Sequence, residues 1–296
     1  MLAACAPVVA PRGLANETPA LETQYFVTRD GLRLPLREWD AKQPKAVIVA
    51  LHGMSDYSEA FDMPGPYWAA HGITTFAYDQ RGFGAAPDPG LWGGGRAMRH
   101  DLSDFVAAVQ ARYPGLPVYA LGESMGGAVV LSALAGKDPP RIAGAILCAP
   151  AVWGRRDMPL SYRVVLWLTA HTMPWLHVSG EGLHIWPSDN IEMLRKLSRD
   201  PLYQHSARAD QVYGLVNLMD AAHAAPKHLA DPPPILFLYG AHDQVIPAKP
   251  YQEVIAALGH KAEVHRFPNG YHMLLRDLDR KEVWQTIVGW IGGLSR

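Results

Sequence analysis

Short apolar runs alternate with segments of helical spacing along most of the chain. The apolar runs cover residues 46–51, 73–78, 118–121, 143–149 and 235–239. A continuous apolar run of this length is typical of a strand in a parallel sheet that helices cover on both faces. Helical spacing is found at 61–71, 98–113, 128–135, 251–258 and 283–294, and a further strand is predicted at 262–267. The alternation predicts an α/β fold with a mostly parallel central sheet and helices on both faces.

Two regions depart from this alternation. Segments 25–28 and 32–39 read as strands joined by a turn at Asp30-Gly31, which predicts a hairpin before the first parallel strand. Between residues 151 and 231 the strand pattern disappears, and helical spacing takes its place. We therefore expect an α/β core of residues 23–150 and 232–296, a helical insertion at 151–231, and a flexible N-terminal tail at 1–22.

A candidate nucleophile lies where the apolar run 118–121 meets the next helix. The residues from Gly122 to Gly126 read G-E-S-M-G, a G-x-S-x-G pattern. A serine at a sharp strand-to-helix turn is held in a strained conformation, and the flanking glycines let strand and helix approach closely. The turn exposes the hydroxyl beside the helix N-terminus, so we expect Ser124 to be a nucleophile.

A serine hydroxyl needs a base, and the base needs an orienting acid. In this topology the acid and then the base should follow the serine at the carboxyl ends of later strands. Asp243 follows the run 235–239, and His272 follows the strand 262–267. We expect Asp243 to orient His272 and His272 to deprotonate Ser124. The neighbouring His242 is a weaker candidate for the base, because consecutive side chains seldom converge.

An oxyanion hole needs two backbone N–H donors, one after the nucleophile and one from the loop after an earlier strand. Met125 follows Ser124, and Met54 lies in the H-G-M loop after residues 46–51. These two N–H groups are the predicted donors. We expect His52 to order this loop by hydrogen bonding rather than to act as a second base.

Five motifs occur in one order along the chain. They are H-G-M at 52–54, D-Q-R-G-F-G at 79–84, G-E-S-M-G-G at 122–127, G-A-H-D at 240–243 and G-Y-H-M at 270–273. In this order they resemble the α/β-hydrolase superfamily, and within it the monoglyceride lipase and lysophospholipase group, also called the serine aminopeptidase S33 type. The resemblance covers about residues 24 to 295.

The resemblance implies a serine hydrolase that cleaves carboxylic esters of monoacylglycerol-like or lysophospholipid-like substrates through an acyl-enzyme, without a cofactor or a metal. It also implies that the insertion is a cap that roofs the site and selects the acyl chain. Asp79 is expected to pair with basic groups below the site. Ala85 replaces the group's usual small hydroxyl residue, which we expect to be harmless.

Other activities of the superfamily stay open. A serine nucleophile argues against dehalogenases and epoxide hydrolases, which use aspartate. A small-ester carboxylesterase, a cofactor-free haloperoxidase and a carbon–carbon bond hydrolase would share the triad. A proline iminopeptidase would need an acidic cap residue, for which Glu181 and Glu192 are available. A non-catalytic binding module is the least favoured hypothesis, because every catalytic position is filled.

The insertion carries the candidate substrate-binding residues, which are Trp153, Trp167, Leu168 and Trp175. Along 160–176, Leu160, Val164, Trp167, Leu168 and His171 form one helical face that would suffice to pack on the body. Apolar residues continue around the rest of the helix. Either the helix is buried on two sides, or its surplus apolar face lines an acyl tunnel or touches a lipid surface.

The composition of the chain limits which binding partners and which cellular locations are expected. The 296 residues are 49% hydrophobic with a formal net charge of -1, which is typical of a soluble globular protein and argues against nucleic acid as a partner. The two cysteines form neither a disulfide framework nor a metal motif. Leu2 to Cys5 resembles a bacterial lipobox, but a basic region and an apolar stretch before it are missing. Two locations stay open, the bacterial cell envelope for a lipoprotein and the cytoplasm. Association with a membrane would take place through a lipid anchor on Cys5 or through the cap. The sequence does not predict an oligomeric state.

Overall fold

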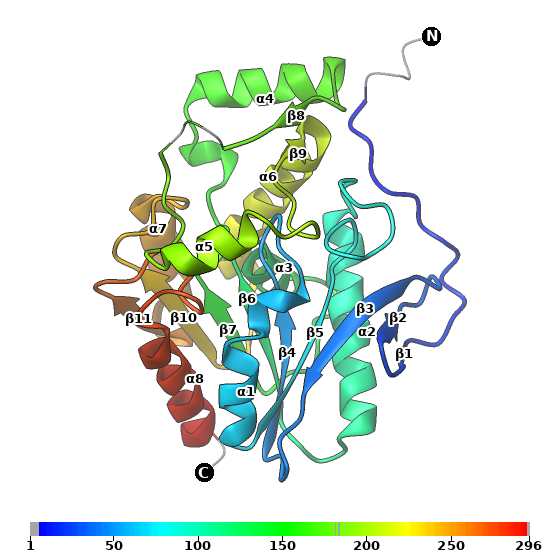
Figure 1. The fold of residues 1–296 in the computed structure, drawn as a ribbon, viewed down its shortest axis with the longest axis vertical. Coiled ribbons are helices and arrows are strands. Elements are labelled where there is room, and N and C mark those ends of the chain that lie inside the picture. Colours follow the sequence, from blue (N-terminus) through cyan, green and yellow to red (C-terminus); the bar gives the residue numbers. More distant parts are fainter. Residues whose placement is uncertain (1–5, 181, 183, 295–296) are drawn as a thin grey trace.

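The computed structural model describes residues 6–180, 182 and 184–294, and its architecture is a central sheet covered by helices (Figure 1). Within these residues the main sheet has nine strands in the order β1-β2-β3-β5-β4-β6-β7-β10-β11. Strands β5, β4, β6, β7, β10 and β11 run parallel to one another, while β1, β2 and β3 add an antiparallel edge.

The strands of the main sheet are β1 (Ala20–Leu21), β2 (Tyr25–Val27), β3 (Arg33–Trp39), β4 (Ala46–Leu51), β5 (Ile73–Tyr78), β6 (Val118–Glu123), β7 (Gly144–Cys148), β10 (Ile235–Gly240) and β11 (Ala262–Phe267). The helices of the core are α1 (Pro64–Ala70), α2 (Gly95–Arg112), α3 (Met125–Leu134), α7 (Ala248–Leu258) and α8 (Arg280–Leu294). Single 3-10 turns lie at Ser58–Phe61 and Gly259–Lys261.

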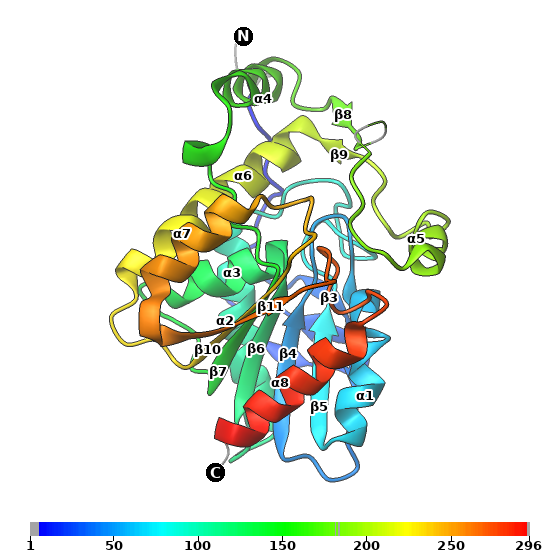
Figure 2. The ribbon, with the colours of Figure 1, turned by 90° about the vertical axis from the view of Figure 1, so that its left-hand side faces the viewer.

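The two faces of the sheet bury separate cores. Along β4, Val47, Val49 and Leu51 pack with residues of α2, α3, α6 and α7, whereas Ile48 and Ala50 pack with residues of α1 and α8. All six residues of β4 are buried, because alternate side chains of a strand point to opposite faces and both faces are covered. Figure 2 shows α1 and α8 together on one side of the sheet. The predicted mostly parallel α/β fold, with its hairpin at β2 and β3, is confirmed.

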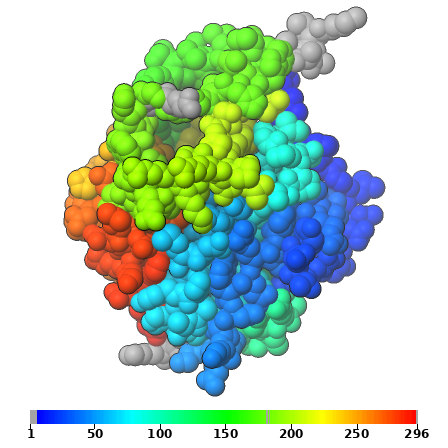
Figure 3. Space-filling model, in the orientation of Figure 1, coloured from blue at the N-terminus to red at the C-terminus, as the bar shows by residue number. Residues whose placement is uncertain are grey.

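Residues 151–231 lie beyond the carboxyl ends of the parallel strands (Figures 1 and 2). They form α4 (Leu160–Thr172), β8 (His177–Val178), α5 (Ile191–Leu197), β9 (Ala207–Arg208) and α6 (Ala209–Ala224), with 3-10 turns at Arg155–Asp157 and Ala225–His228. The small antiparallel pair β8–β9 is a difference from the all-helical insertion that the sequence predicts. In the view of Figure 3, this green to yellow segment covers the upper part of the molecule.

Contacts tie the insertion to loops that follow the strands. The Tyr57 hydroxyl donates to Asp200 at 2.7 Å, and the Ser188 hydroxyl donates to Asp277 at 2.6 Å. The Gln204 N–H donates to the Ser55 carbonyl at 2.8 Å. The insertion therefore roofs the loops after β4 and β11.

Helix α4 does not pack as the sequence predicts. Leu160, Val164, Trp167 and Leu168, predicted to face the body, are between 47% and 67% exposed. Of the two alternatives for this helix, burial on two sides is therefore wrong. Ala170 is its buried residue, Leu166 packs against the core, and the His171 ring meets the Tyr213 ring of α6. The helix ends at Thr172, before Pro174, so it also stops short of residue 176.

The N-terminal segment is not a free tail where the structure describes it. The Ala10 N–H donates to the Trp92 carbonyl at 2.9 Å, and the Val8 N–H donates to Asp210 at 3.3 Å. Leu21, in the strand β1, pairs with β2. From Val8 onward this segment thus has contacts with the rest of the chain, while its flexibility stays a prediction. Cys5 lies outside the described residues, and its lipidation stays a prediction.

Candidate active site

Ser124 occupies the sharp turn between β6 and α3. Its φ of 52° and ψ of -112° are an unusual conformation for a residue with a side chain, and such strain is common at functional sites. The Ser124 N–H donates to the Cys148 carbonyl at 2.9 Å, and the Ser124 carbonyl accepts from the Ala151 N–H at 2.8 Å. These bonds to the neighbouring strand and its following loop hold the strained turn in place.

The two glycines of the motif are required by space. A Cβ on Gly122 would lie 2.3 Å from the carbonyl carbon of Gly126, and a Cβ on Gly126 would lie 2.2 Å from the Leu51 carbonyl oxygen. No side chain fits at either distance. The chain can therefore turn from β6 into α3 this tightly only with glycine on both sides of Ser124.

The structure brings Ser124, His272 and Asp243 into one hydrogen-bonded chain. The His272 Nδ1 lies 2.8 Å from Asp243 Oδ2, and His272 Nε2 lies 2.9 Å from Ser124 Oγ. A carboxylate only accepts hydrogen bonds, so Nδ1 carries the proton and Nε2 is free to accept from the serine hydroxyl. Asp243 follows β10 and His272 follows β11, at the strand ends where the sequence predicts an acid and a base.

Three further groups hold Asp243, and the sequence analysis missed them. The N–H groups of Val245 and Ile246 donate to Asp243 Oδ1 at 2.8 and 2.9 Å, and the Tyr251 hydroxyl donates to Oδ2 at 2.7 Å. An aspartate that accepts from backbone N–H groups two and three residues ahead is a common turn motif. An aspartate in the loop shortly before a helix, here α7 from Ala248, is a sequence signal that could have indicated the two backbone bonds.

The buried pair has pKa values that favour its charged forms. Burial alone would raise the pKa of Asp243, but His272 and the hydrogen bonds to the carboxylate hold it below its ordinary value. Burial alone would lower the pKa of His272, but the Asp243 carboxylate holds it above its ordinary value. The site therefore stabilises an imidazolium beside Asp243, the state that a general base enters when it takes a proton.

His242 is turned away from this chain of hydrogen bonds. Its side chain is exposed, and its ring packs 5.5 Å from the ring of Tyr271. The position agrees with the preference for His272 as the base.

The loop after β4 lies against the serine. A Cβ built on Gly53 would be 3.3 Å from the Ser124 Cβ and 3.8 Å from its Oγ. The buried His52 accepts from the Gln80 N–H through Nε2 at 2.9 Å, so its Nδ1 donates to the Gly53 carbonyl at 2.8 Å. This agrees with the predicted role of His52 in ordering the loop. Burial lowers the pKa of His52 and keeps its ring neutral.

The predicted oxyanion donors are Met125, which follows Ser124 in sequence, and Met54, which lies in the loop after β4. Met125 is the first residue of α3, where N–H groups have no acceptor inside the helix. Met54 follows Gly53, on which an added Cβ would come within 3.3 Å of the Ser124 Cβ. Their action as donors stays a prediction.

A buried ion-pair network lies beneath the site and was not predicted. The Arg276 guanidinium contacts Asp56 and lies 3.1 Å from Glu123 Oε2. Asp56 lies in the loop after β4, Glu123 is the last residue of β6, and Arg276 lies in the loop after β11, so one cation joins two loops and the strand end before Ser124. Burial raises the pKa of Glu123, and the Arg276 charge opposes that rise. Charged residues in loops usually indicate exposure, so the sequence offers no signal for this network.

One implication of the family resemblance is wrong. Asp79 accepts from the Ser58 N–H and hydroxyl at 2.9 and 2.6 Å and from the Ala85 N–H at 2.9 Å, rather than pairing with a basic group. The basic residue of the motif, Arg81, instead bridges Asp30 and Asp101. Because Ala85 contributes its backbone N–H, the missing hydroxyl side chain does not affect this contact.

The predicted substrate-binding residues of the insertion differ in their surroundings. Trp153 is partly buried against the core of the α3 and α6 face. Trp167, Leu168 and Trp175 are about half exposed. The structure thus separates Trp153, which is held by the body, from three residues near the outer surface. Of the acidic residues considered for an aminopeptidase, Glu192 is exposed on α5, and Glu181 lies outside the described residues.

A strained serine between a parallel strand and a helix, with an acid and a histidine after later strands, is the arrangement of an α/β hydrolase. The model of the family described as serine aminopeptidase, S33, matches residues 42–279, and the chain belongs to this family.

The relatives agree with that assignment. Human monoglyceride lipase is 26% identical over 301 residues, which covers 95% of this chain and 94% of the relative. Monoacylglycerol lipase of Mycolicibacterium smegmatis is 26% identical over 283 residues, or 90% and 95% of the two chains. A soluble variant of Saccharomyces cerevisiae monoglyceride lipase, solved with a substrate analog, superposes with a TM-score of 0.79 at 20% identity and covers 97% of this chain and 100% of its own.

Proposed function

We propose that this protein hydrolyses carboxylic ester bonds of monoacylglycerol-like or lysophospholipid-like substrates through an acyl-enzyme intermediate on Ser124. The observation that carries the proposal is the hydrogen-bonded chain from Ser124 Oγ through His272 to Asp243 at a strained turn. Relatives that are monoglyceride or monoacylglycerol lipases over nearly the whole chain support the substrate class.

The chemistry follows from the proton positions. Ser124 Oγ attacks the ester carbonyl while its proton moves to His272 Nε2, and Asp243 stabilises the imidazolium that results. The imidazolium then gives this proton to the leaving alcohol, such as glycerol, and the acyl group stays on Ser124. Water enters, loses a proton to Nε2 and attacks the acyl carbonyl, which releases the fatty acid and restores the serine hydroxyl.

The tetrahedral intermediates carry negative charge on the former carbonyl oxygen. The N–H groups of Met125 and Met54 are suited to stabilise it, the first at a helix N-terminus and the second in the loop beside Ser124. Both donors are fixed by backbone structure, so they need no reorganisation when the charge develops.

The proposal is tested by measuring how fast the purified full chain hydrolyses monoacylglycerols, lysophospholipids and acetyl esters. We expect activity on monoacylglycerols, lysophospholipids or both, and lower activity on acetyl esters. Ser124→Ala should reduce kcat by about 10⁴ to 10⁶, His272→Ala by a similar factor, and the double variant by little more, because the two residues act as one unit. His242→Ala is the matched control and should be close to wild type. Ser124→Ala with more than a tenth of wild-type activity would contradict the proposal.

The insertion presents an apolar surface that could contact the lipid in which the proposed substrates are found. Among the described residues from 160 to 186, twelve large apolar side chains are exposed, namely Leu160, Tyr162, Val164, Val165, Trp167, Leu168, Met173, Trp175, Leu176, Val178, Ile185 and Trp186. Exposed apolar surface of this extent on one segment is typical of a contact site. The proposed occupant is the surface of a membrane or lipid aggregate, because the proposed substrates are amphiphiles that gather in membranes and micelles. Among the described residues, no helix combines the length and the apolar character needed to cross a bilayer.

A further inference from the structure

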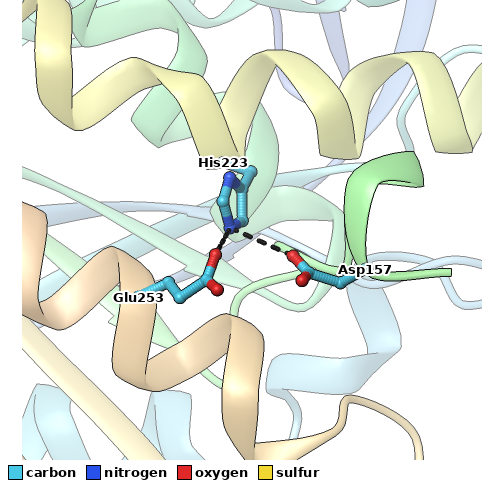
Figure 4. A group of neighbouring side chains, drawn as sticks. All are labelled: Asp157, His223 and Glu253. Carbon is cyan, nitrogen blue, oxygen red and sulfur yellow. Dashed lines mark ion pairs between the residues drawn. The ribbon is translucent and has the colours of Figure 1, made fainter.

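Three side chains from separate elements converge outside the candidate active site. Asp157 ends the 3-10 turn Arg155–Asp157, His223 lies in the last turn of α6, and Glu253 lies in α7 (Figure 4). His223 Nε2 is 3.2 Å from Glu253 Oε2 and 3.6 Å from Asp157 Oδ2. One ligand atom from each residue lies within 4.8 Å of the other two. Figure 4 shows the imidazole directing this nitrogen toward both carboxylates.

The converging atoms are buried and lack hydrogen bonds. Asp157 Oδ2, His223 Nε2 and Glu253 Oε2 have no hydrogen-bond partner among the described residues. The side chains of Asp157 and His223 are only 3% and 10% exposed, and that of Glu253 is 28% exposed. Buried polar atoms nearly always have a hydrogen-bond partner, so three converging atoms that lack one need an explanation. A bound cation would accept a lone pair from all three at once.

The donor set and its spacing fit a transition metal. Zinc binds imidazole nitrogen and carboxylate oxygen at 2.0–2.2 Å in a tetrahedron, so neighbouring ligand atoms are about 3.4 Å apart. The two distances from His223 Nε2 are close to this value. Calcium and magnesium prefer six or more oxygen ligands, which a site with an imidazole does not offer. We propose that Asp157, His223 and Glu253 form a binding site for a divalent transition-metal ion, with Zn²⁺ the best fit and water in the fourth position.

Two basic side chains next to the site, Lys249 and Arg156, would respond differently to a bound metal ion. Lys249 Nζ donates to Asp157 Oδ1 at 2.6 Å and lies 3.6 Å from Glu253 Oε1, so it uses the oxygens that the metal leaves free. Arg156 lies 3.9 Å from Asp157 Oδ2 and 3.7 Å from Glu253 Oε2, the ligating oxygens themselves. The Arg156 side chain is 59% exposed and is free to move into solvent. The metal therefore displaces Arg156 but leaves Lys249 in place.

The site would connect the insertion to the core. Asp157 precedes α4, His223 ends the long helix of the insertion, and Glu253 belongs to the core helix α7. The same helix carries Tyr251, which donates to Asp243. A metal here would fix the entry and exit of the insertion to the helix that supports the catalytic acid.

Titration of the chelator-treated full chain with Zn²⁺ tests the site. Calorimetry should detect one equivalent, and the Tm should rise with Zn²⁺ concentration, because the ion binds only the folded site. His223→Gln and Glu253→Gln should each weaken binding by at least about tenfold and remove the Tm rise. Arg156→Gln should tighten binding, because it removes the competing cation. His228→Gln, an exposed histidine close to the same helix, is the matched control and should leave binding unchanged.

The outcomes separate a metal site from an ion pair. X-ray absorption at the zinc edge should report nitrogen and oxygen ligands without sulfur, and acidification should weaken binding, because protons compete for the imidazole. A wild-type chain that binds no equivalent of Zn²⁺ would overturn the proposal, as would an equivalent that both glutamine variants retain. Asp157, His223 and Glu253 would then be an ion-pair cluster, and His223→Gln would lower the Tm with or without zinc.

Discussion

At the scale of single residues, the proposed chemistry depends on the protonation of His272. Its imidazole must be neutral to take the serine proton, and Asp243 raises its pKa above the ordinary value of about 6.5. As the pH falls, His272 therefore becomes protonated, and stops acting as a base, at a higher pH than an isolated histidine does.

This sets the direction of the pH profile. The kcat/KM for a soluble ester should rise with pH and level off only above about 6.5, because kcat/KM reports the pKa of the free enzyme. Asp243→Asn removes the raising charge and leaves the burial that lowers the pKa of His272, so the acidic limb should move to lower pH. The kcat of this variant should fall by less than in Ser124→Ala. An acidic limb that does not move in Asp243→Asn would contradict the role of Asp243.

At the scale of elements, Arg276 connects the loops after β4 and β11 with the last residue of β6. Its side chain is 3% exposed, and its two acidic partners are buried as deeply. Removing one partner of a buried ionic group leaves uncompensated charge and typically costs about 3–5 kcal/mol.

Arg276→Met should therefore lower the free energy of unfolding by about 3–5 kcal/mol, measured by urea denaturation. Arg163→Met, in the exposed helix α4, is the control and should change it by no more than about 0.5 kcal/mol. Adding Glu123→Gln and Asp56→Asn to Arg276→Met should restore part of the loss. Equal stability of the two arginine variants would show that the network does not support these loops.

Helix α4 provides the second test at this scale. Each methylene of a substrate that leaves water contributes up to ~0.8 kcal/mol, so kcat/KM should climb from acetyl to medium-chain esters. Trp167→Ala and Leu168→Ala should flatten this climb and weaken binding to lipid vesicles roughly tenfold, while acetyl ester hydrolysis stays close to wild type. A profile that peaks at acetyl esters and is unchanged in both variants would leave a small-ester hydrolase with the same triad.

At the scale of the whole molecule, the sequence predicts the elements whose burial is simple. The predicted bounds are those observed for β4, β5 and β11. For β4 and β5 the reason is that each is an apolar run buried on both faces. The start of α1 is later than predicted, because Ser58–Phe61 forms a 3-10 turn and Pro64 begins the helix. The strand-end rule also brings Asp243 and His272 to Ser124, although their catalytic roles stay predictions.

Features that depend on long-range packing were not predictable from pattern. The sequence pattern predicts that an apolar helix is buried, yet most of α4 is exposed. Ala170 is buried and Leu166 packs against the core, whereas His171 meets Tyr213 of α6, within the insertion itself. A charged loop residue is read as exposed, yet Arg276 is buried. Asp157, His223 and Glu253 are far apart in sequence and share no motif spacing, so only the fold reveals that they converge.

The most direct test of the central claim is covalent labelling of the folded chain with a fluorophosphonate, which only an activated serine attacks at an appreciable rate. Mass spectrometry should find one adduct per chain, on the peptide that contains Ser124. The adduct should be absent in Ser124→Ala and form far more slowly in His272→Ala than in His242→Ala. A chain that stays unlabelled, or that is labelled at another serine, would contradict the assignment of Ser124 as the nucleophile.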